Sequence, residues 1–290
     1  MFLRWPLALL FLAPALVLYG VFTLLPAGLG VGLSLTNSTG VGSAQFVGLD
    51  NFARMFTDPV VGIALRNVLI YVVFVTVVQN ALGLAFALAL AQTPSVRNFL
   101  RAALLTPSMI SALIAGFVWS SIYSPLGGGL NEALKAIGLG GLARAWLGDS
   151  STALIAIAVV NVWMFTGYSA VIWLTGYLSI PQELLDSAAL DGANGWQRFR
   201  YIEWAMLAPA ATVNLTLTLI GASKVFELPL VMTRGGPGDV TQVPGLFIYH
   251  TAFSGNRFGY GTALALSFAL IVVLVSTLQS HYLRNREKLL

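Results

Sequence analysis

The sequence predicts an all-α polytopic membrane protein with six transmembrane helices. Of its 290 residues, 57% are hydrophobic and only 9% are charged, whereas about 25% of residues are charged in soluble domains. Mean hydropathy is +0.83. A helix that crosses the hydrocarbon core needs about 20 mostly apolar residues. Six segments meet this requirement: residues 7–33, 68–91, 102–123, 153–178, 204–225 and 262–282.

The first segment resembles a signal peptide only at its start. Arg4 precedes the apolar run, but the run continues past Gly20, beyond the ~7–15 residues of a secretory core. We therefore expect a retained first span. Three of the segments carry internal prolines, which packed neighbouring helices tolerate: Pro14, Pro26, Pro107 and Pro209.

The distribution of cations predicts the orientation. Eight Lys or Arg residues fall on one side of the predicted spans and seven on the other. The first set occupies shorter segments nearer the span ends, and the positive-inside rule gives such segments the most weight. Both termini and the 179–203 segment are thus expected in the cytoplasm. The opposite side receives the longer loops 36–67, 124–152 and 226–261.

This pattern predicts three parts of the chain. Residues 1–67 form the first helix and its external loop, residues 68–282 form a core of five helices, and residues 283–290 form a cytoplasmic tail.

Residues 179–203 form a polar break that is longer than a simple connection requires. Pro181 suits a helix start, and Glu183 lies where the helix dipole favours negative charge. Leu185, Ala188 and Ala189 make an apolar stripe at helical spacing. Gly192 is placed to leave the helix in a left-handed conformation, and a second helical pattern begins near Trp196. We interpret the segment as a docking element for a partner outside the membrane, rather than as a solvated loop helix.

The predicted membrane spans contain almost no ionisable side chains. Their polar residues are mostly amides and hydroxyls: Gln79, Asn80, Ser108, Ser111, Asn161, Tyr168 and Asn214. Ion-coupled carriers usually place Asp, Glu, His or Lys there, and an intramembrane enzyme would need a catalytic cluster.

None of the three lysines lies in a phosphate-binding G-x-x-x-x-G-K-[ST] motif. The sequence has no Cys and only two distant His, so we expect no metal site, and no basic stripe predicts nucleic-acid binding.

Two motifs resemble those of importer-type ABC permeases. Residues 186–193, Asp-Ser-Ala-Ala-Leu-Asp-Gly-Ala, resemble the E-A-A-x-x-D-G-A motif, with Asp in place of Glu and Ser in place of Ala. Residues 233–238, Thr-Arg-Gly-Gly-Pro-Gly, resemble the T-x-G-G-P segment of the maltose and glycerol-3-phosphate class, in the first permease of the pair. Residues 46–52 and 129–131 fit the same carbohydrate-type pattern.

This resemblance implies a type I ABC importer permease fold and a heteromeric transporter. A second, similar permease, two ATPase subunits and an extracytoplasmic solute-binding protein would complete it. ATP and Mg²⁺ would bind the ATPases, so this chain would hold no cofactor and would not be an enzyme. The resemblance also implies that the chain lies in a bacterial plasma membrane. The residues implied in ATPase coupling are Glu183, Asp186, Ser187, Ala188, Asp191, Gly192 and Ala193.

Two further sets are candidate solute contacts. Amides and aromatic rings suit a polyhydroxylated solute. The candidates for contact with such a solute are Asn161, Trp163, Tyr168 and Asn214. Hydrogen bonding between helices and interfacial aromatic rings would explain these residues equally well. Lys224 and Glu227 lie where the resembling permease lines its sugar path, or else form an i, i+3 ion pair. The resemblance implies that four residues lie on the external face near the binding protein: Thr233, Gly235, Gly236 and Pro237. The alternative interpretation is that these residues form a simple turn.

Two other classes of function remain open from the sequence. A secondary carrier or facilitator for a small polar solute would show inverted repeats and buried ionisable residues, and neither is evident. A scaffold without a solute path would not need amides in mid-membrane.

Overall fold

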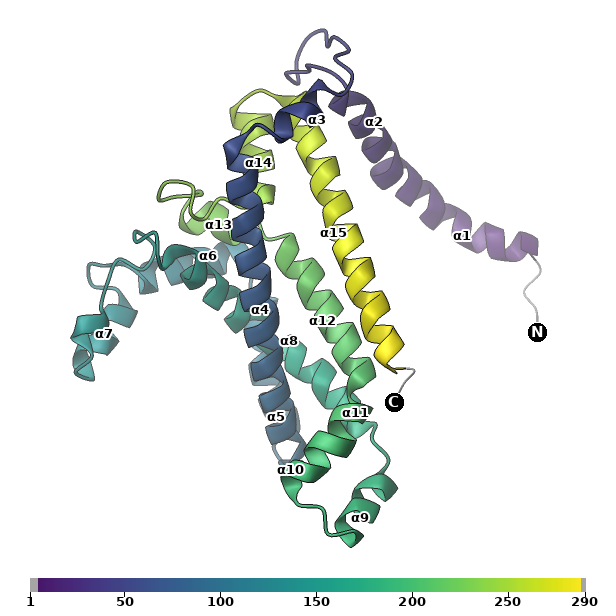
Figure 1. The fold of residues 1–290 in the computed structure, drawn as a ribbon, viewed down its shortest axis with the longest axis vertical. Coiled ribbons are helices and arrows are strands. Elements are labelled where there is room, and N and C mark those ends of the chain that lie inside the picture. Colours follow the sequence, from purple (N-terminus) through teal and green to yellow (C-terminus); the bar gives the residue numbers. More distant parts are fainter. Residues whose placement is uncertain (1–4, 288–290) are drawn as a thin grey trace. The chain divides into compact units, whose positions relative to one another are not determined.

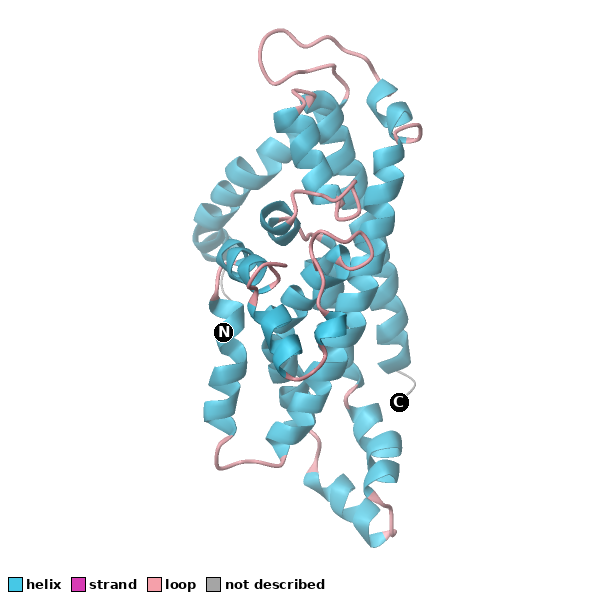
Figure 2. Cartoon of the chain, turned by 90° about the vertical axis from the view of Figure 1, so that its left-hand side faces the viewer, coloured by secondary structure: helices cyan, strands magenta, loops and turns pink. Residues whose placement is uncertain are grey.

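A computed structural model describes residues 5–287 of the chain, which contain helices and loops and no strand (Figure 2). The α-helices are α1 (Trp5–Tyr19), α2 (Leu25–Ser34), α3 (Asp50–Met55), α4 (Pro59–Ala91), α5 (Arg97–Leu105), α6 (Ala112–Ile122), α7 (Gly129–Ala136), α8 (Ala153–Leu178), α9 (Gln182–Leu190), α10 (Gly195–Arg198), α11 (Trp204–Met206), α12 (Ala208–Ser223), α13 (Glu227–Met232), α14 (Pro244–Tyr249) and α15 (Phe258–Glu287). Shorter 3₁₀ and π turns join them: η1 (Gly20–Leu24), η2 (Thr106–Met109), η3 (Gly140–Leu142), η4 (Phe199–Glu203) and η5 (His250–Ser254).

Within the described residues, five helical segments are long and apolar enough to cross a membrane: Phe11–Ser34, Pro59–Ala91, Ala153–Leu178, Ala208–Met232 and Phe258–Asn285. They overlap five of the six predicted spans. The sixth corresponds to a bent pair, Arg97–Met109 and Ala112–Ile122, whose parts meet at 92°. The fold therefore has up to six spans.

The expectation of one continuous helix over residues 102–123 is wrong. Pro107 lies in η2, and the backbone at Ile110 and Ser111 is extended, with ψ of 137° at both residues. Proline has no N–H to donate and crowds the preceding turn, which favours a break. The end of α5 packs tightly on α8, because a Cβ at Gly167 would collide with the carbonyl of Leu104.

The predicted fifth span also begins differently. Its long helix starts at Ala208 rather than at Trp204, and Pro209 lies in the first turn instead of the interior. The missing N–H of a proline has no partner to lose there.

The second span is longer than predicted, since α4 begins at Pro59 and includes Asn67, whose amide donates to the carbonyls of Asp239 (3.0 Å) and Gln242 (2.9 Å).

Contacts divide the chain into two compact units. One comprises residues up to Val61 together with Phe247–Leu270, and the other comprises Gly62–Leu246 together with the residues from Ile271 on. In the first unit, the Asn51 amide donates to the carbonyls of Ser34 and Thr36, both at 2.8 Å. The Tyr260 hydroxyl donates to Asp58 at 2.9 Å, and Arg54 lies over the same ring.

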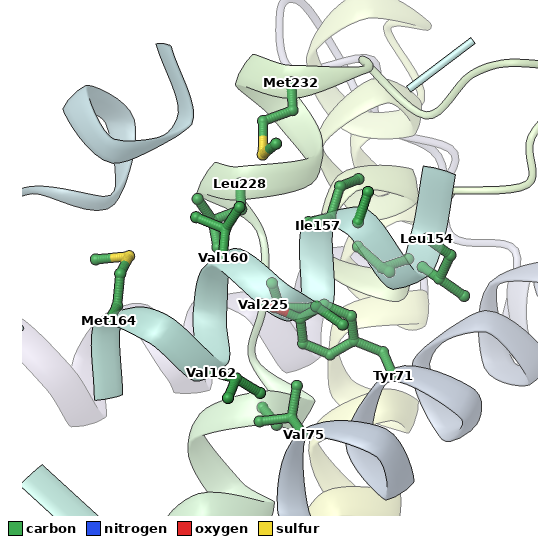
Figure 3. Close-up of a cluster of buried hydrophobic side chains, with 14 of the residues drawn as sticks. Tyr71, Val75, Leu154, Ile157, Val160, Val162, Met164, Val225, Leu228 and Met232 are labelled. Carbon is green, nitrogen blue, oxygen red and sulfur yellow. The ribbon is translucent and has the colours of Figure 1, made fainter. Parts of the chain in front are cut away.

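The second unit holds the main core, formed by α4, α8 and the α12–α13 region (Figure 3). Tyr71 and Val75 of α4 pack against Ile157 and Val160 of α8, with Val225 nearby. Small residues let the helices approach closely, as is usual in membranes. A Cβ at Gly83 of α4 would meet the Ser169 hydroxyl and the Ala170 backbone of α8, and one at Gly176 would meet Ala210 of α12.

Asn131, in the carbohydrate-type motif of residues 129–131, organises the loop between α6 and α8. The residue is buried; its Oδ1 accepts from Trp146 Nε1 at 2.8 Å, and its Nδ2 donates to the Arg144 carbonyl at 3.0 Å. Within this chain, Asn131 therefore fixes loop geometry.

Candidate functional site

The predicted docking segment folds as two short helices at one end of the second unit, where α8 ends and α11 begins (Figure 1). Pro181 is the residue before α9, with an extended ψ of 128°. The helix ends with Gly192 at φ +77°. Gly192 N–H donates to the Ala189 carbonyl at 3.1 Å and Ala193 N–H to the Ala188 carbonyl at 3.0 Å. This is the Schellman arrangement, so the predicted left-handed exit at Gly192 is confirmed.

The apolar stripe of α9 differs from the prediction at one position. Ala188 is buried and Leu185 is half-buried, but Ala189 is exposed. The reason is that only one narrow side of this nine-residue helix contacts the rest of the chain. The other coupling candidates on α9 are exposed as well: Glu183, Asp186 and Ser187.

Large apolar side chains also project from this segment. Leu190 is 89% exposed and Trp196 is 70% exposed. Apolar groups at a tip that carries Asp186 and Asp191 are the pattern of a surface that another protein covers.

The second helix, α10, begins with a capping box. Asn194 Oδ1 accepts from the Gln197 N–H at 2.9 Å, and Gln197 Oε1 accepts from the Asn194 N–H at 2.8 Å. The helical pattern predicted near Trp196 is therefore confirmed.

An ion pair within this segment, which sequence reasoning did not identify, is linked to α8 by a hydrogen bond from Tyr177. The buried carboxylate of Glu203 accepts from Arg198 Nε at 2.8 Å and from the Tyr177 hydroxyl at 3.2 Å. The only sequence signal was an acidic residue close to an arginine at the edge of a predicted span.

The second unit contains a cavity of about 270 Å³ between α4, α8 and α12. It brings together three of the predicted solute contacts, namely Asn161, Tyr168 and Asn214. The other lining residues are Gln79, Phe165, Leu217, Thr218, Gly221 and Ala222. Gln79 was recognised as a polar interior residue but not as a contact, and Phe165 and Thr218 carried no distinguishing signal.

Hydrogen bonds orient the amides of this cavity. Asn214 Nδ2 donates to Ser169 Oγ at 2.7 Å and to the Ser169 carbonyl at 3.2 Å, and Gln79 Nε2 donates to Thr218 Oγ1 at 3.4 Å. The lining includes no Asp, Glu, His, Lys or Arg. Within the described residues, no group of three His, Asp or Glu side chains is arranged to hold a metal ion. The cavity therefore offers amide, hydroxyl and aromatic contacts to an uncharged polar molecule.

Lys224 and Glu227 do not share a helix face. Lys224 caps the end of α12, and Glu227 begins α13 after a break at Phe226. Neither residue belongs to the ion pairs found in the described part of the chain, so the predicted i, i+3 pair is wrong. They also lie outside the cavity lining, as does Trp163, whose ring instead contacts Trp119 at 5.5 Å between centroids.

Residues 233–238 form a compact loop after α13, at the other end of α12 from α9 (Figure 1). Thr233 Oγ1 donates to the Pro229 carbonyl at 3.1 Å and lies 2.7 Å from Thr241 Oγ1, which in turn donates to the Gly236 carbonyl at 2.8 Å. Gly235 is buried with φ +95°, and a Cβ there would collide with Gln242. Gly236 and Pro237 are half-buried. The loop is thus more ordered than a simple turn.

Comparison with known proteins defines the class. Residues 79–288 match the family described as the inner membrane component of binding-protein-dependent transport systems. The chain is 34% identical over 278 residues to AmyD of Thermoanaerobacterium thermosulfurigenes, a probable starch degradation products transport system permease protein, with 96% of this chain and 94% of AmyD covered. It is 31% identical to MsmF, the multiple sugar-binding transport system permease protein of Streptococcus mutans, with 93% and 92% covered.

A solved structure shares the fold. One chain of a bacterial ABC transporter involved in the import of alginate superposes with a TM-score of 0.83 at 22% identity, with 96% of this chain and 95% of that chain covered. The fold is therefore that of an ABC importer permease, as predicted. The chain belongs to the family of binding-protein-dependent transport system inner membrane components and is a multi-pass permease subunit.

Proposed function

We propose that this chain forms the translocation path for an uncharged sugar or related polyol. The observation that carries the proposal is the cavity between α4, α8 and α12. Its amides and the Tyr168 ring match the hydroxyls and apolar faces of a sugar. The absence of charged residues from its lining disfavours an anionic solute. Relatives named for starch products and multiple sugars support the same class.

We further propose that the energy enters through the 179–203 segment. A separate pair of ATPases would bind ATP and Mg²⁺, and α9 would fit into a groove on one of them. The exposed Leu190 and Trp196 would become buried in that contact. Closure of the ATPases would move α9 and shift this chain and a second permease between inward- and outward-facing states. The segment and both termini, including residues 1–4 and 288–290 outside the described range, would then be cytoplasmic.

At the opposite end of α12, the loop of Thr233, Gly235, Gly236 and Pro237 would lie near the solute-binding protein. Lys224 and Glu227, close to that end, remain candidates for contact with solute on its way to the cavity. A secondary carrier is set aside, because the family is that of binding-protein-dependent systems.

Reconstitution tests this proposal. The chain would be incorporated into liposomes with its second permease, ATPase and binding protein, and a panel of neutral and anionic sugars would be screened for uptake and stimulated ATP hydrolysis. Stimulation by a neutral sugar is the expected result. Stimulation by anionic solutes alone would overturn the assigned solute class, and failure to bind any ATPase would overturn the coupling role.

Replacing Asn161 with leucine, which has nearly the same shape, is expected to lower uptake of the transported sugar about three- to tenfold at subsaturating concentration, because one neutral hydrogen bond is lost. Assembly and basal ATP hydrolysis should be retained. Trp163→Leu, two residues along α8 and outside the cavity, is the matched control. Equal uptake by wild type and Asn161→Leu would remove Asn161 from the path.

A further inference from the structure

A second, larger cavity lies in the same unit, and neither the family nor the proposed function assigns it a ligand. Its volume is about 580 Å³, compared with about 270 Å³ for the cavity described above. It is open on one side and is lined by α4, α8, the stretch from Arg200 to Leu215 and Leu283 of α15. The lining is mostly aliphatic and aromatic, and its volume falls in the range of about 300–1,000 Å³ that small-molecule sites occupy.

Three residues that line this cavity each carry a buried polar atom that has no hydrogen-bond partner in the described part of the chain. The atoms are Trp173 Nε1, Thr76 Oγ1 and Asn80 Oδ1. Trp173 is only 2% exposed. Buried polar groups are nearly always paired in proteins. These three atoms have almost no accessible surface, so they are packed behind the wall and a ligand in the cavity does not reach them.

The rim of the cavity carries a cation and two amphipathic rings. Arg200 is exposed and makes no hydrogen bond or ion pair with another described residue. No carboxylate lines the cavity. Tyr201 and Trp204 lie beside Arg200, and both are exposed. Trp and Tyr are enriched where a membrane protein meets the lipid headgroups, and the arginine fork suits phosphate oxygens.

We propose that this cavity binds an anionic phospholipid of the surrounding bilayer. The lipid phosphate lies against Arg200, with Tyr201 and Trp204 at headgroup level. One acyl chain enters between α4 and α12 along Val77, Leu84 and Ala211. The charge of Arg200, the apolar lining and the exposed rings of Tyr201 and Trp204 favour this occupant.

Lipid exchange followed by mass spectrometry tests the proposal without requiring transport. The full-length chain, with any subunits that co-purify, is exchanged against vesicles of phosphatidylcholine containing increasing phosphatidylglycerol. Retained lipid is then identified. We expect selective retention of phosphatidylglycerol. Arg200→Gln should weaken that retention about fivefold, the effect of one basic residue near an anionic surface. The matched control Arg101→Gln removes an arginine outside the cavity and should leave retention unchanged.

A second variant tests the cavity independently of charge. Ala81 lines the cavity and is exposed, so Ala81→Phe should narrow it and reduce retention while preserving the fold. Ala85→Phe, one turn further along α4 and also exposed outside the lining, is its control. Equal retention of the two lipids, indifference to both cavity variants, or a cross-link that places a partner helix inside the cavity would each overturn the proposal.

Discussion

Replacing Gly192 with valine is expected to abolish solute-stimulated ATP hydrolysis while the transporter still assembles. Gly192 has φ +77°, and its N–H closes the end of α9. A left-handed conformation costs an L-residue about 1–2 kcal/mol, and β-branched residues fit it worst. No atom lies within 4 Å of a Cβ added there. The effect is therefore on backbone direction, not on packing.

A change of direction at this position would displace the coupling segment as a whole. Ala193 and Asn194 follow directly, and Asn194 caps α10 through its bonds with Gln197. If the exit from α9 is altered, α9 and α10 lose their fixed relation, and the exposed Leu190 and Trp196 change position relative to each other. We expect at least a tenfold loss of stimulated hydrolysis, corresponding to about 1.4 kcal/mol of lost coupling.

Gly138 provides a matched control within the chain. It ends α7 with φ +81°, with the same two hydrogen bonds, and a Cβ there would also meet nothing within 4 Å. Gly138→Val should therefore strain the backbone equally and spare coupling. Gly192→Asn should be intermediate, because asparagine visits this conformation more readily. Wild-type coupling in Gly192→Val, or an equal loss in Gly138→Val, would contradict the assigned role.

The membrane spans are predictable because hydropathy over about 20 residues is a strong signal. Five of them follow directly from the apolar segments. The bend between α5 and α6 does not, since residues 102–123 are mostly apolar on both sides of it and only the backbone around Pro107, Ile110 and Ser111 departs from the helix. Hydropathy reports how apolar a segment is and does not reveal where its backbone changes direction.

The local geometry of the coupling segment is partly predictable for a different reason. The end of a helix depends on nearby residues, so Gly192 and the spacing of α9 were sufficient to predict the left-handed exit. The exposure of Ala189 depends on which side of α9 meets the rest of the chain, and that is tertiary information.

The lining of the smaller cavity, between α4, α8 and α12, is predictable in part from local sequence and depends in part on tertiary packing. Asn161, Tyr168 and Asn214 could be nominated because polar residues in apolar segments are conspicuous. Gln79 and Thr218 join them only because α4 packs beside α12 and their side chains form a hydrogen bond. Lys224 and Glu227 were wrongly paired because the helix was assumed to continue through Phe226.

Replacing Arg198 with leucine is expected to destabilise the assembled protein by about 2 kcal/mol, because it leaves the Glu203 carboxylate buried without its cation. The Glu203 side chain is only 4% exposed, whereas that of Arg198 is 40% exposed. The partial exposure of Arg198 places the effect below the about 3–5 kcal/mol typical of fully buried pairs. Differential scanning calorimetry should show a melting temperature lower by roughly 4–8 °C.

Three further variants separate charge burial from simple loss of contacts. Arg198→Leu combined with Glu203→Leu should be more stable than Arg198→Leu alone, because the double change leaves no buried charge. Tyr177→Phe removes one hydrogen bond to Glu203 and should cost about 1 kcal/mol. Lys135→Leu breaks the exposed Lys135–Glu132 pair, whose side chains are 54% and 55% exposed, and should be nearly neutral. If the double variant is no more stable than Arg198→Leu, the carboxylate of Glu203 reaches water once its partner is gone, and the role of Arg198 in neutralising a buried charge is refuted.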